Sequence, residues 1–462
     1  MTTPILDFVR AYAKRDAVRL HMPGHKGIPA LGCESLDITE IPGADDLSHP
    51  VPGGIIRESE NNAASLFGAE RTVYSTEGSS QCIRAMIWLA ALNDRYAHPR
   101  GDFQEGQVQK PRRQTRPKIL AARNAHKAFL YAAALTDLDV QWLMPTESAS
   151  LCACPVDARQ VREALDACEE PPIAVYLTSP DYLGGQLPIR EIAQVCHARG
   201  VPLLLDQAHG AYLKFLSTDM HAITQGADMC CDSAHKTLPV LTGGAYLHIR
   251  RGAPAVFREH VKEAMSLFGS TSPSYLILAS LDACNRTLAE DFCARLAERC
   301  VQLAELKERL AKRGWQVVGT EPMKLTLLCP VGLSGTALAA RLRRDNMECE
   351  YADEDYLVIM PSVGTLPEQL SALEAALGDN VLPPKRPEPL CRALPEVVMR
   401  VRDAVFAPSE RIPVDCALGR ICAAPTISCP PAIPIAVSGE RIGQEEIALF
   451  RRFGITEVSV VL

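Results

Sequence analysis

The stretch Asp232-Ser233-Ala234-His235-Lys236-Thr237-Leu238 directly follows an apolar run at residues 227–231. Such a run, bounded by polar residues, predicts a buried strand. Ligands of α/β proteins bind at the carboxyl ends of the strands, which is where Lys236 would emerge. A lysine after a strand is by itself most often a surface residue, so the meaning of Lys236 depends on its neighbours.

The same alternation of short apolar runs and helical stretches extends on both sides of this lysine. The helical stretch 189–199 ends at Gly200, a residue that commonly terminates helices. This pattern predicts an α/β fold with parallel strands and crossover helices, arranged as a three-layer αβα domain. The expected strands are 118–122, 172–178, 201–206, 227–231 and 244–249, and the expected helices include 158–168 and 189–199.

The rest of the chain divides by composition into four predicted parts. Residues 1–60 read as an irregular arm, 61–285 as the major domain and 286–382 as a small α+β domain. A proline-rich junction then precedes a C-terminal domain at 390–462. In the small domain we expect helices at 286–313, 335–345 and 366–377 and strands within 315–330 and 347–360, and the charged segment 100–117 predicts a solvated loop.

Composition excludes several classes of protein. The 462 residues carry a net charge of −7, which gives no basic field for binding nucleic acid. The 17 cysteines are odd in number and form no C-x-x-C pair, which favours reduced thiols in the cytoplasm. Charged residues interrupt the N-terminus and no long apolar run occurs, so we expect neither a signal peptide nor a membrane span.

Asp206 is the first neighbour that gives Lys236 a chemical meaning. It closes the apolar run Leu203-Leu204-Leu205 and precedes Lys236 by about one strand–helix–strand unit. Pyridoxal phosphate needs a lysine for its aldehyde and an anion for its pyridine nitrogen, and protonation of that nitrogen makes the ring an electron sink. Lys236 and Asp206 match these two needs.

Two further groups of residues would complete a binding site for this cofactor, one for its phosphate and one for its ring. The residues Gly78, Ser79, Ser80 and Gln81 precede a helical stretch, whose N-terminal amides favour an anion such as a phosphate. Ser233 and His235 can add donors from beside the lysine. His126 follows the strand that ends near Ala122, and its imidazole can lie against the cofactor ring.

The ordered motifs of the chain resemble those of the ornithine/lysine/arginine decarboxylase family, whose members are fold-type-I pyridoxal-phosphate enzymes. The resemblance spans nearly the whole chain. It is carried by Met22-Pro23-Gly24-His25-Lys26, Thr39-Glu40-Ile41-Pro42-Gly43-Ala44-Asp45-Asp46, Arg123-Asn124-Ala125-His126-Lys127, Asp206-Gln207-Ala208-His209-Gly210, Ser233-Ala234-His235-Lys236-Thr237-Leu238 and Thr271-Ser272-Pro273-Ser274-Tyr275.

The resemblance implies a role for each residue. Lys236 would form the imine with the cofactor, Asp206 would pair with the pyridine nitrogen, and His126 would stack on the ring. A homodimer or dimer of dimers with sites at the interface is implied, and the chain is similar to the short form that lacks an N-terminal wing. The implied cofactor-binding residues are Gly78, Ser79, Ser80, Gln81, His126, Asp206, Ala208, His209, Ser233, His235 and Lys236, with Thr271 or Ser272 of a neighbouring subunit.

The chain also departs from the family pattern. Glu77 stands where asparagine is common before the phosphate-loop glycine, and Thr242-Gly243 occupies a Thr-Gln position. Near the C-terminus, Cys429-Pro430-Pro431-Ala432-Ile433-Pro434 replaces a Tyr-Pro-Pro-Gly-Ile-Pro motif, and Ser438-Gly439-Glu440 stands where Pro-Gly-Glu is usual.

The resulting prediction is decarboxylation of arginine, lysine or ornithine, with arginine preferred, through imine exchange at Lys236, giving an amine of polyamine biosynthesis. Lys236 or His235 would protonate Cα, and Glu350, Asp353, Asp355 and Glu440 could meet the distal cation of the substrate. The alternatives are an aminotransferase or lyase on the same fold, or a catalytically silent cofactor-binding relative. No metal is expected, because Pro23 and Gly24 interrupt the helix that would pair His21 with His25.

Overall fold

The computed structural model describes residues 1–15, 17–39, 41–98, 116–145, 150–386, 395–428 and 433–462. They form two compact units. Unit one comprises 1–119, 165–177 and 189–293, and unit two comprises 120–164, 178–188 and 294–462. The predicted loop at 100–117 lies almost wholly outside the described residues, as does the Pro430-Pro431-Ala432 part of the C-terminal motif.

In the described part of the chain, the large sheet has seven strands in the order β1-β7-β6-β5-β4-β2-β3. Five of them confirm predicted strands, while β1 and β3 carry too many polar residues to have been predicted from apolar runs. The strands are β1 (Arg71–Ser75), β2 (Lys118–Ala122), β3 (Asp139–Leu143), β4 (Val175–Thr178), β5 (Leu203–Asp206), β6 (Met229–Asp232) and β7 (Ala245–Ile249).

The prediction that these strands are all parallel was wrong for β7. β5 and β6 run parallel, but β7 is antiparallel to both of its neighbours, β6 and β1. Only a one-turn helix, α8 (Ala234–Thr237), lies between β6 and β7, so the chain has no long crossover and returns in the opposite direction. The short connection places Lys236 within that return.

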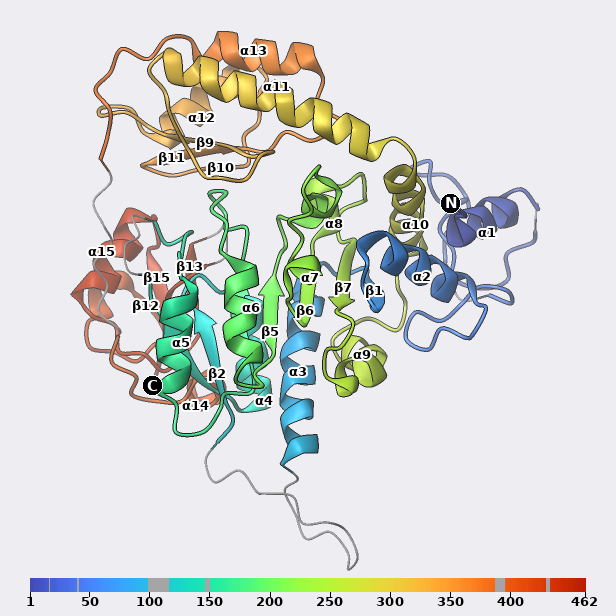
Figure 1. Cartoon of the computed structure of the whole chain (residues 1–462), viewed down its shortest axis with the longest axis horizontal. Coiled ribbons are helices and arrows are strands. Elements are labelled where there is room, and N and C mark those ends of the chain that lie inside the picture. The colour runs from blue at the N-terminus through green and yellow to red at the C-terminus, as the bar shows by residue number, and fades with distance from the viewer. Residues whose placement is uncertain (16, 40, 99–115, 146–149, 387–394, 429–432) are drawn as a thin grey trace, which may run out of the picture. The chain divides into compact units, whose positions relative to one another are not determined.

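Helices pack against the sheet strands of unit one. The long helix α3 contacts β1, β5, β6 and β7, while α6 packs on β5 and α7 on β6 (Figure 1). The helical elements of this unit are α1 (Pro4–Ala13), α2 (Ile55–Phe67), α3 (Ser79–Ala97), α6 (Ile189–His197), η1 (Ala211–Phe215), α7 (Ala222–Gln225), α8, α9 (Ala255–Leu267) and α10 (Tyr275–Ala289).

The start of the chain is more ordered than the predicted irregular arm. α1 begins with Pro4, a residue suited to the first turn, and buries Ile5, Val9 and Tyr12. It packs against α2 and α10, and the Leu6 amide donates to Asp282 at 3.0 Å. The irregular part of the arm lies between α1 and α2.

Unit two contains a four-stranded antiparallel sheet in the order β10-β11-β9-β8 and two small two-stranded sheets, β12–β15 and β13–β14. This confirms the α+β character predicted for the C-terminal parts. Its elements are α4 (Lys127–Thr136), β3, β8 (Gln316–Val318), β9 (Leu325–Leu328), α12 (Gly335–Arg344), β10 (Tyr351–Ala352), β11 (Tyr356–Ile359), α13 (Pro367–Leu377), α14 (Val401–Phe406), β12 (Ser409–Pro413), η2 (Val414–Cys416), β13 (Thr426–Ser428), β14 (Ile433–Ala436), α15 (Gln444–Arg452) and β15 (Glu457–Val461).

Four elements are divided between the units: β2, β4, α5 (Ala158–Asp166) and α11 (Phe292–Lys312). The predicted continuous helix at 286–313 is in fact the end of α10 followed by α11. The backbone leaves the helical region at Glu290, with φ −94° and ψ −93°. The four-part domain division remains a prediction.

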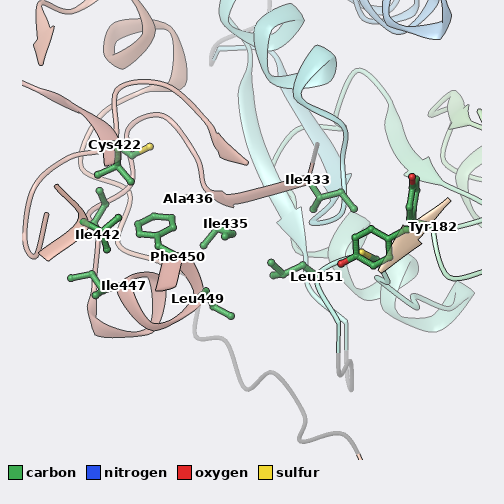
Figure 2. Packing of buried hydrophobic residues seen from close by; sticks show 14 of the residues in the cluster. Leu151, Tyr182, Cys422, Ile433, Ile435, Ala436, Ile442, Ile447, Leu449 and Phe450 are labelled. Atoms are coloured by element: carbon green, nitrogen blue, oxygen red, sulfur yellow. The ribbon is translucent and has the colours of Figure 1, made fainter. Parts of the chain in front are cut away.

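An apolar cluster in unit two holds the C-terminal segment together. Figure 2 shows Phe450 of α15 among Ile435, Ile442 and Ile447, and all four are buried. Burying one such side chain contributes about 2–3 kcal/mol, so these contacts suffice to fix a small sheet and a short helix. The cluster also contains Leu151 and Tyr182 from earlier parts of the chain.

Candidate active site

The carboxyl ends of β5 and β6 bring the predicted lysine and aspartate to one edge of the sheet. Asp206 is the last residue of β5 and pairs in register with Cys231 of β6. Asp232 ends β6, and Ser233 follows it at once. The Gln207 amide donates to the Cys231 carbonyl at 3.0 Å and continues the pairing beyond β5. The two loops that leave these strands therefore begin side by side.

Lys236 lies in the short helix α8 and reaches back to the loop after β5. Its Nζ is 3.0 Å from Nε2 of His209. His209 is buried, whereas the Lys236 residue is exposed. The contact joins the Asp206-Gln207-Ala208-His209 motif to the Ser233-Ala234-His235-Lys236 motif, as a shared site requires.

Among the described residues of unit one, the Asp206 carboxylate has three hydrogen-bond donors. Oδ1 accepts from the Ala208 amide at 3.2 Å and from the Cys231 thiol at 3.7 Å. Oδ2 accepts from the Tyr176 hydroxyl at 3.3 Å. Sequence reasoning did not find Tyr176 or Cys231. The sequence did offer one signal for Tyr176, because it places this hydroxyl-bearing residue within the apolar strand predicted at 172–178.

The N-terminus of α3 has the features of an anion site. Gly78 precedes the helix with φ +71°, a conformation that favours glycine, and supplies no side-chain cap to the first amides. The Ser233 hydroxyl is 2.8 Å from the Ser79 hydroxyl, so the loop after β6 meets this helix start. Gln81 is turned to other partners: it accepts from Ser75 at 2.5 Å and donates to the Met265 carbonyl at 2.8 Å.

His235 has a defined tautomer. Its Nδ1 is 3.1 Å from the Gly244 carbonyl, and a carbonyl only accepts, so Nδ1 carries the proton. Burial lowers the pKa of His235, which keeps the ring neutral at pH 7. The ring therefore offers Nε2 as an acceptor.

A second carboxylate, Asp232, forms a buried network that the sequence did not predict. Its Oδ2 accepts from Nε2 of His221 at 2.9 Å and of His248 at 3.1 Å, and its Oδ1 from Gln207 at 3.0 Å. Burial alone would raise the pKa of Asp232, but the two histidines outweigh it and hold the pKa well below its ordinary value.

His221, Asp232 and the nearby Cys230 also have the spacing of a metal-ligand group. The polar atoms of His221 are already engaged, because its Nδ1 accepts from the Ile223 amide while Nε2 donates to Asp232. Burial raises the pKa of Cys230, so its sulfur is a thiol and not the thiolate that binds metals. The arrangement is that of a hydrogen-bond network.

His126 belongs to unit two, where it caps a helix. Its Nδ1 accepts from the Ala128 amide at 3.1 Å at the start of α4. Its stacking on a cofactor ring remains a prediction.

Nearby in the chain, Arg123 forms a buried two-point ion pair with Glu440, at 2.7 and 2.8 Å, and its guanidinium lies 4.8 Å from the Trp142 ring centroid. The Glu440 carboxylate is therefore held by Arg123 and by the Val437 amide.

The other predicted substrate residues are also in unit two. Glu350 is exposed and accepts from the Tyr182 hydroxyl at 2.6 Å. Asp353 accepts from the Tyr351 hydroxyl at 2.7 Å and from two backbone amides. Asp355 is buried and paired with Lys385 and Arg452. Of these carboxylates, Glu350 keeps the most accessible surface.

Thr271 and Ser272, predicted to reach a neighbouring subunit, lie exposed in the loop between α9 and α10. In the same loop the Ser270 amide donates to the Glu77 carboxylate. The Glu77 residue is exposed, so water can surround its carboxylate charge.

The donor set of unit one fits pyridoxal phosphate. A lysine, a buried carboxylate and a helix start without a side-chain cap, flanked by serine hydroxyls, lie on segments joined by the Lys236–His209 and Ser233–Ser79 contacts. They correspond to the needs of an aldehyde, a pyridine nitrogen and a phosphate. Among the described residues, no helix combines the length and apolar character that crossing a bilayer requires.

Family models and known proteins match most of this chain. Residues 111–326 match the Orn/Lys/Arg decarboxylase major domain, and residues 386–458 match the C-terminal domain of the same family. An arginine decarboxylase of Halalkalibacterium halodurans is 30% identical, over 97% of this chain and 93% of the relative. An arginine decarboxylase of Bacillus subtilis is also 30% identical, over 96% and 92%.

Solved structures share the fold at lower identity. The lysine decarboxylase LdcF of Francisella novicida superposes with a TM-score of 0.77 at 16% identity, covering 100% of this chain and 81% of that one. Lysine decarboxylase A of Pseudomonas aeruginosa gives 0.77 at 18% identity, with 99% and 80% coverage. These neighbours confirm the predicted fold class. The chain belongs to the Orn/Lys/Arg decarboxylase family.

Proposed function

We propose that the chain is a pyridoxal-phosphate-dependent decarboxylase that converts a basic amino acid, with arginine preferred, into the corresponding amine. The observation that carries the proposal is the 3.0 Å contact between Lys236 and His209, which joins the loop after β6 to the loop that follows Asp206 at the carboxyl end of β5. When bound, the cofactor supplies an electron sink for the electron pair left by departing carbon dioxide.

Different residues of unit one would bind different parts of the cofactor. Lys236 would hold the aldehyde and Asp206 the pyridine nitrogen. The amides that begin α3, with Ser79, Ser80 and Ser233, would hold the phosphate, because a helix N-terminus favours an anion.

A proton must also reach Cα after carbon dioxide leaves. His235 is neutral, and its one N–H is donated to the Gly244 carbonyl, so it is a poor proton donor. Lys236 carries transferable protons on Nζ and stands beside His209. Lys236 is therefore the better candidate for this step.

Substrate choice is proposed from the relatives and from unit two. The 30% identical relatives are named arginine decarboxylases, which supports arginine. Glu350 is the most accessible of the predicted carboxylates and would pair with a guanidinium, with Asp353 three residues further along the chain. Glu440 is better suited to holding Arg123 than to meeting substrate.

The protein would act in the cytoplasm, in polyamine biosynthesis, as a homodimer or dimer of dimers. Every cysteine that the structure describes is a free thiol, which supports a reducing compartment. Exposed apolar side chains support self-association, because the arm exposes Val18, Leu20, Met22, Ile28 and Leu31 by 65–90% of their areas. Sedimentation of the purified protein tests the assembly.

The experiment that tests the function separates the possible products. Purified protein is incubated with pyridoxal phosphate and with arginine, lysine or ornithine in turn, and both carbon dioxide and keto acid are measured. We expect carbon dioxide, fastest with arginine. Keto acid without carbon dioxide would indicate an aminotransferase, and neither product would indicate a silent relative.

A further inference from the structure

The Asp206 carboxylate is fixed by side chains from two neighbouring strands. Tyr176 of β4 reaches Oδ2 at 3.3 Å and Cys231 of β6 reaches Oδ1 at 3.7 Å, while the Ala208 amide holds Oδ1 from within the same loop. Tyr176 and Cys231 are fully buried and Asp206 is 4% exposed. The carboxylate is therefore held from both sides by the sheet itself.

These donors are weak ones. A hydroxyl normally approaches an oxygen to 2.5–3.0 Å, so the Tyr176 bond is long, and a thiol is a poor donor. Among the described residues, the printed partners of the Asp206 carboxylate are a hydroxyl, a thiol and a backbone amide, and none of these is a cation. The three bonds thus orient the carboxylate but leave most of its negative charge available to a stronger donor.

The same contacts determine where that stronger donor can bind. A carboxylate has about four acceptor positions, two on each oxygen. Oδ1 already accepts from Ala208 and Cys231, whereas Oδ2 accepts only from Tyr176 among the described residues. The second acceptor position of Oδ2 is the one left open.

We propose that Tyr176 and Cys231 are positioning residues that present the open acceptor position of Asp206 to the cofactor's pyridine nitrogen. This inference rests on the proposed function. A buried carboxylate without donors would rotate or take up a proton, and either change weakens its bond to a protonated ring. Tyr176 contributes the larger share, because a hydroxyl is a stronger donor than a thiol.

The test measures cofactor affinity in a double-mutant cycle. Apoprotein is titrated with pyridoxal phosphate while the absorbance of the bound cofactor and its pH dependence are followed. Tyr176→Phe keeps the ring and removes the hydroxyl, and we expect about tenfold weaker binding with a shifted pH profile. In an Asp206→Asn background, Tyr176→Phe should change cofactor affinity by less than about twofold, because the carboxylate through which Tyr176 acts is absent.

The adjacent residues Cys231 and Cys230 supply a test variant and its matched control. Cys231→Ala should weaken binding about threefold, since it loses a weak donor. Cys230→Ala should leave the affinity unchanged, because Cys230 lies with His221 and Asp232 on the other face of β6. The cysteine pair also keeps the test decisive if Tyr176→Phe folds poorly.

Each outcome decides the inference. Unchanged affinity in Tyr176→Phe and Cys231→Ala, or an equal loss in both Asp206 backgrounds, would show that the two residues only pack. Wild-type protein that binds cofactor but releases no carbon dioxide would refute the proposed function. The double-mutant cycle would still test whether Tyr176 and Cys231 position Asp206, because it measures cofactor affinity. Wild-type protein that binds no cofactor would overturn both.

Discussion

Asp206 and Asp232 end neighbouring parallel strands of one sheet, yet their surroundings differ. Asp232 is completely buried and accepts three N–H bonds of 2.9–3.1 Å. Asp206 keeps a little exposed surface and accepts bonds of 3.2–3.7 Å from an amide, a hydroxyl and a thiol. Strong internal donors make a carboxylate part of the scaffold, whereas weak ones leave it ready for a ligand.

The largest expected effect separates the two aspartates by activity. Asp206→Asn removes the anion proposed to keep the pyridine nitrogen protonated, so carbon dioxide release should fall about 1000-fold. The free energy of unfolding should change by less than about 1 kcal/mol, because Asp206 has only weak internal partners. Activity assays and urea unfolding of the same preparation measure both. Activity of Asp206→Asn within tenfold of wild type would contradict the proposed functional role of Asp206.

The matching substitution at Asp232 should have the opposite profile. Asp232→Asn replaces an acceptor of three N–H bonds by an amide that faces two histidine donors, so unfolding should become easier by about 3 kcal/mol. Carbon dioxide release per folded molecule should remain within about threefold of wild type. A large loss of turnover in a fully folded variant would contradict the structural assignment of Asp232.

Acid should weaken the Asp232 network in a defined pH window. Burial lowers the pKa of His248 in the folded chain, so the unfolded chain binds more protons, and stability is lost as the pH falls through about 6.5. The lowered pKa of Asp232 adds a further loss only below about pH 4.

The variant His248→Gln, which keeps an N–H donor for Asp232, isolates this contribution. Between pH 7 and 5 it should lose about 1 kcal/mol less unfolding free energy than wild type. Urea midpoints at both pH values measure the difference. Identical losses in the two proteins would show that His248 does not titrate there.

The smallest effect concerns a third carboxylate, Glu77. It is exposed and bonded to the Ser270 amide, so its charge is screened by water. Glu77→Asn should change cofactor affinity by less than about threefold in the same titration. A tenfold gain would mean that Glu77 opposes the phosphate directly.

Much of the fold was predictable from local patterns. The apolar runs that became β2, β4, β5, β6 and β7 are continuous enough to identify buried strands. The direction of β7 was not predictable from its residues, because direction depends on the length of the connection after β6. The polar strand β1 was missed for a related reason, since it lacks the apolar run used to find the others.

The candidate site was predictable where residues occupy strand ends. Asp206 and Lys236 were predicted as candidates because the sequence places each of them after an apolar run, and they remain a prediction. Tyr176 and Cys231 were not found, because their role depends on the register between neighbouring strands. The pairing of Arg123 with Glu440, 317 residues apart, depends likewise on tertiary packing that no local pattern contains.

Borohydride reduction of the protein with its cofactor tests the central claim most directly. Reduction fixes pyridoxal phosphate on the lysine that holds it, and mass spectrometry of the peptides locates that lysine. The predicted result is a label on Lys236 alone, lost in Lys236→Arg. A label on another lysine, such as Lys214 or Lys324, or no label on protein saturated with cofactor, would contradict the account.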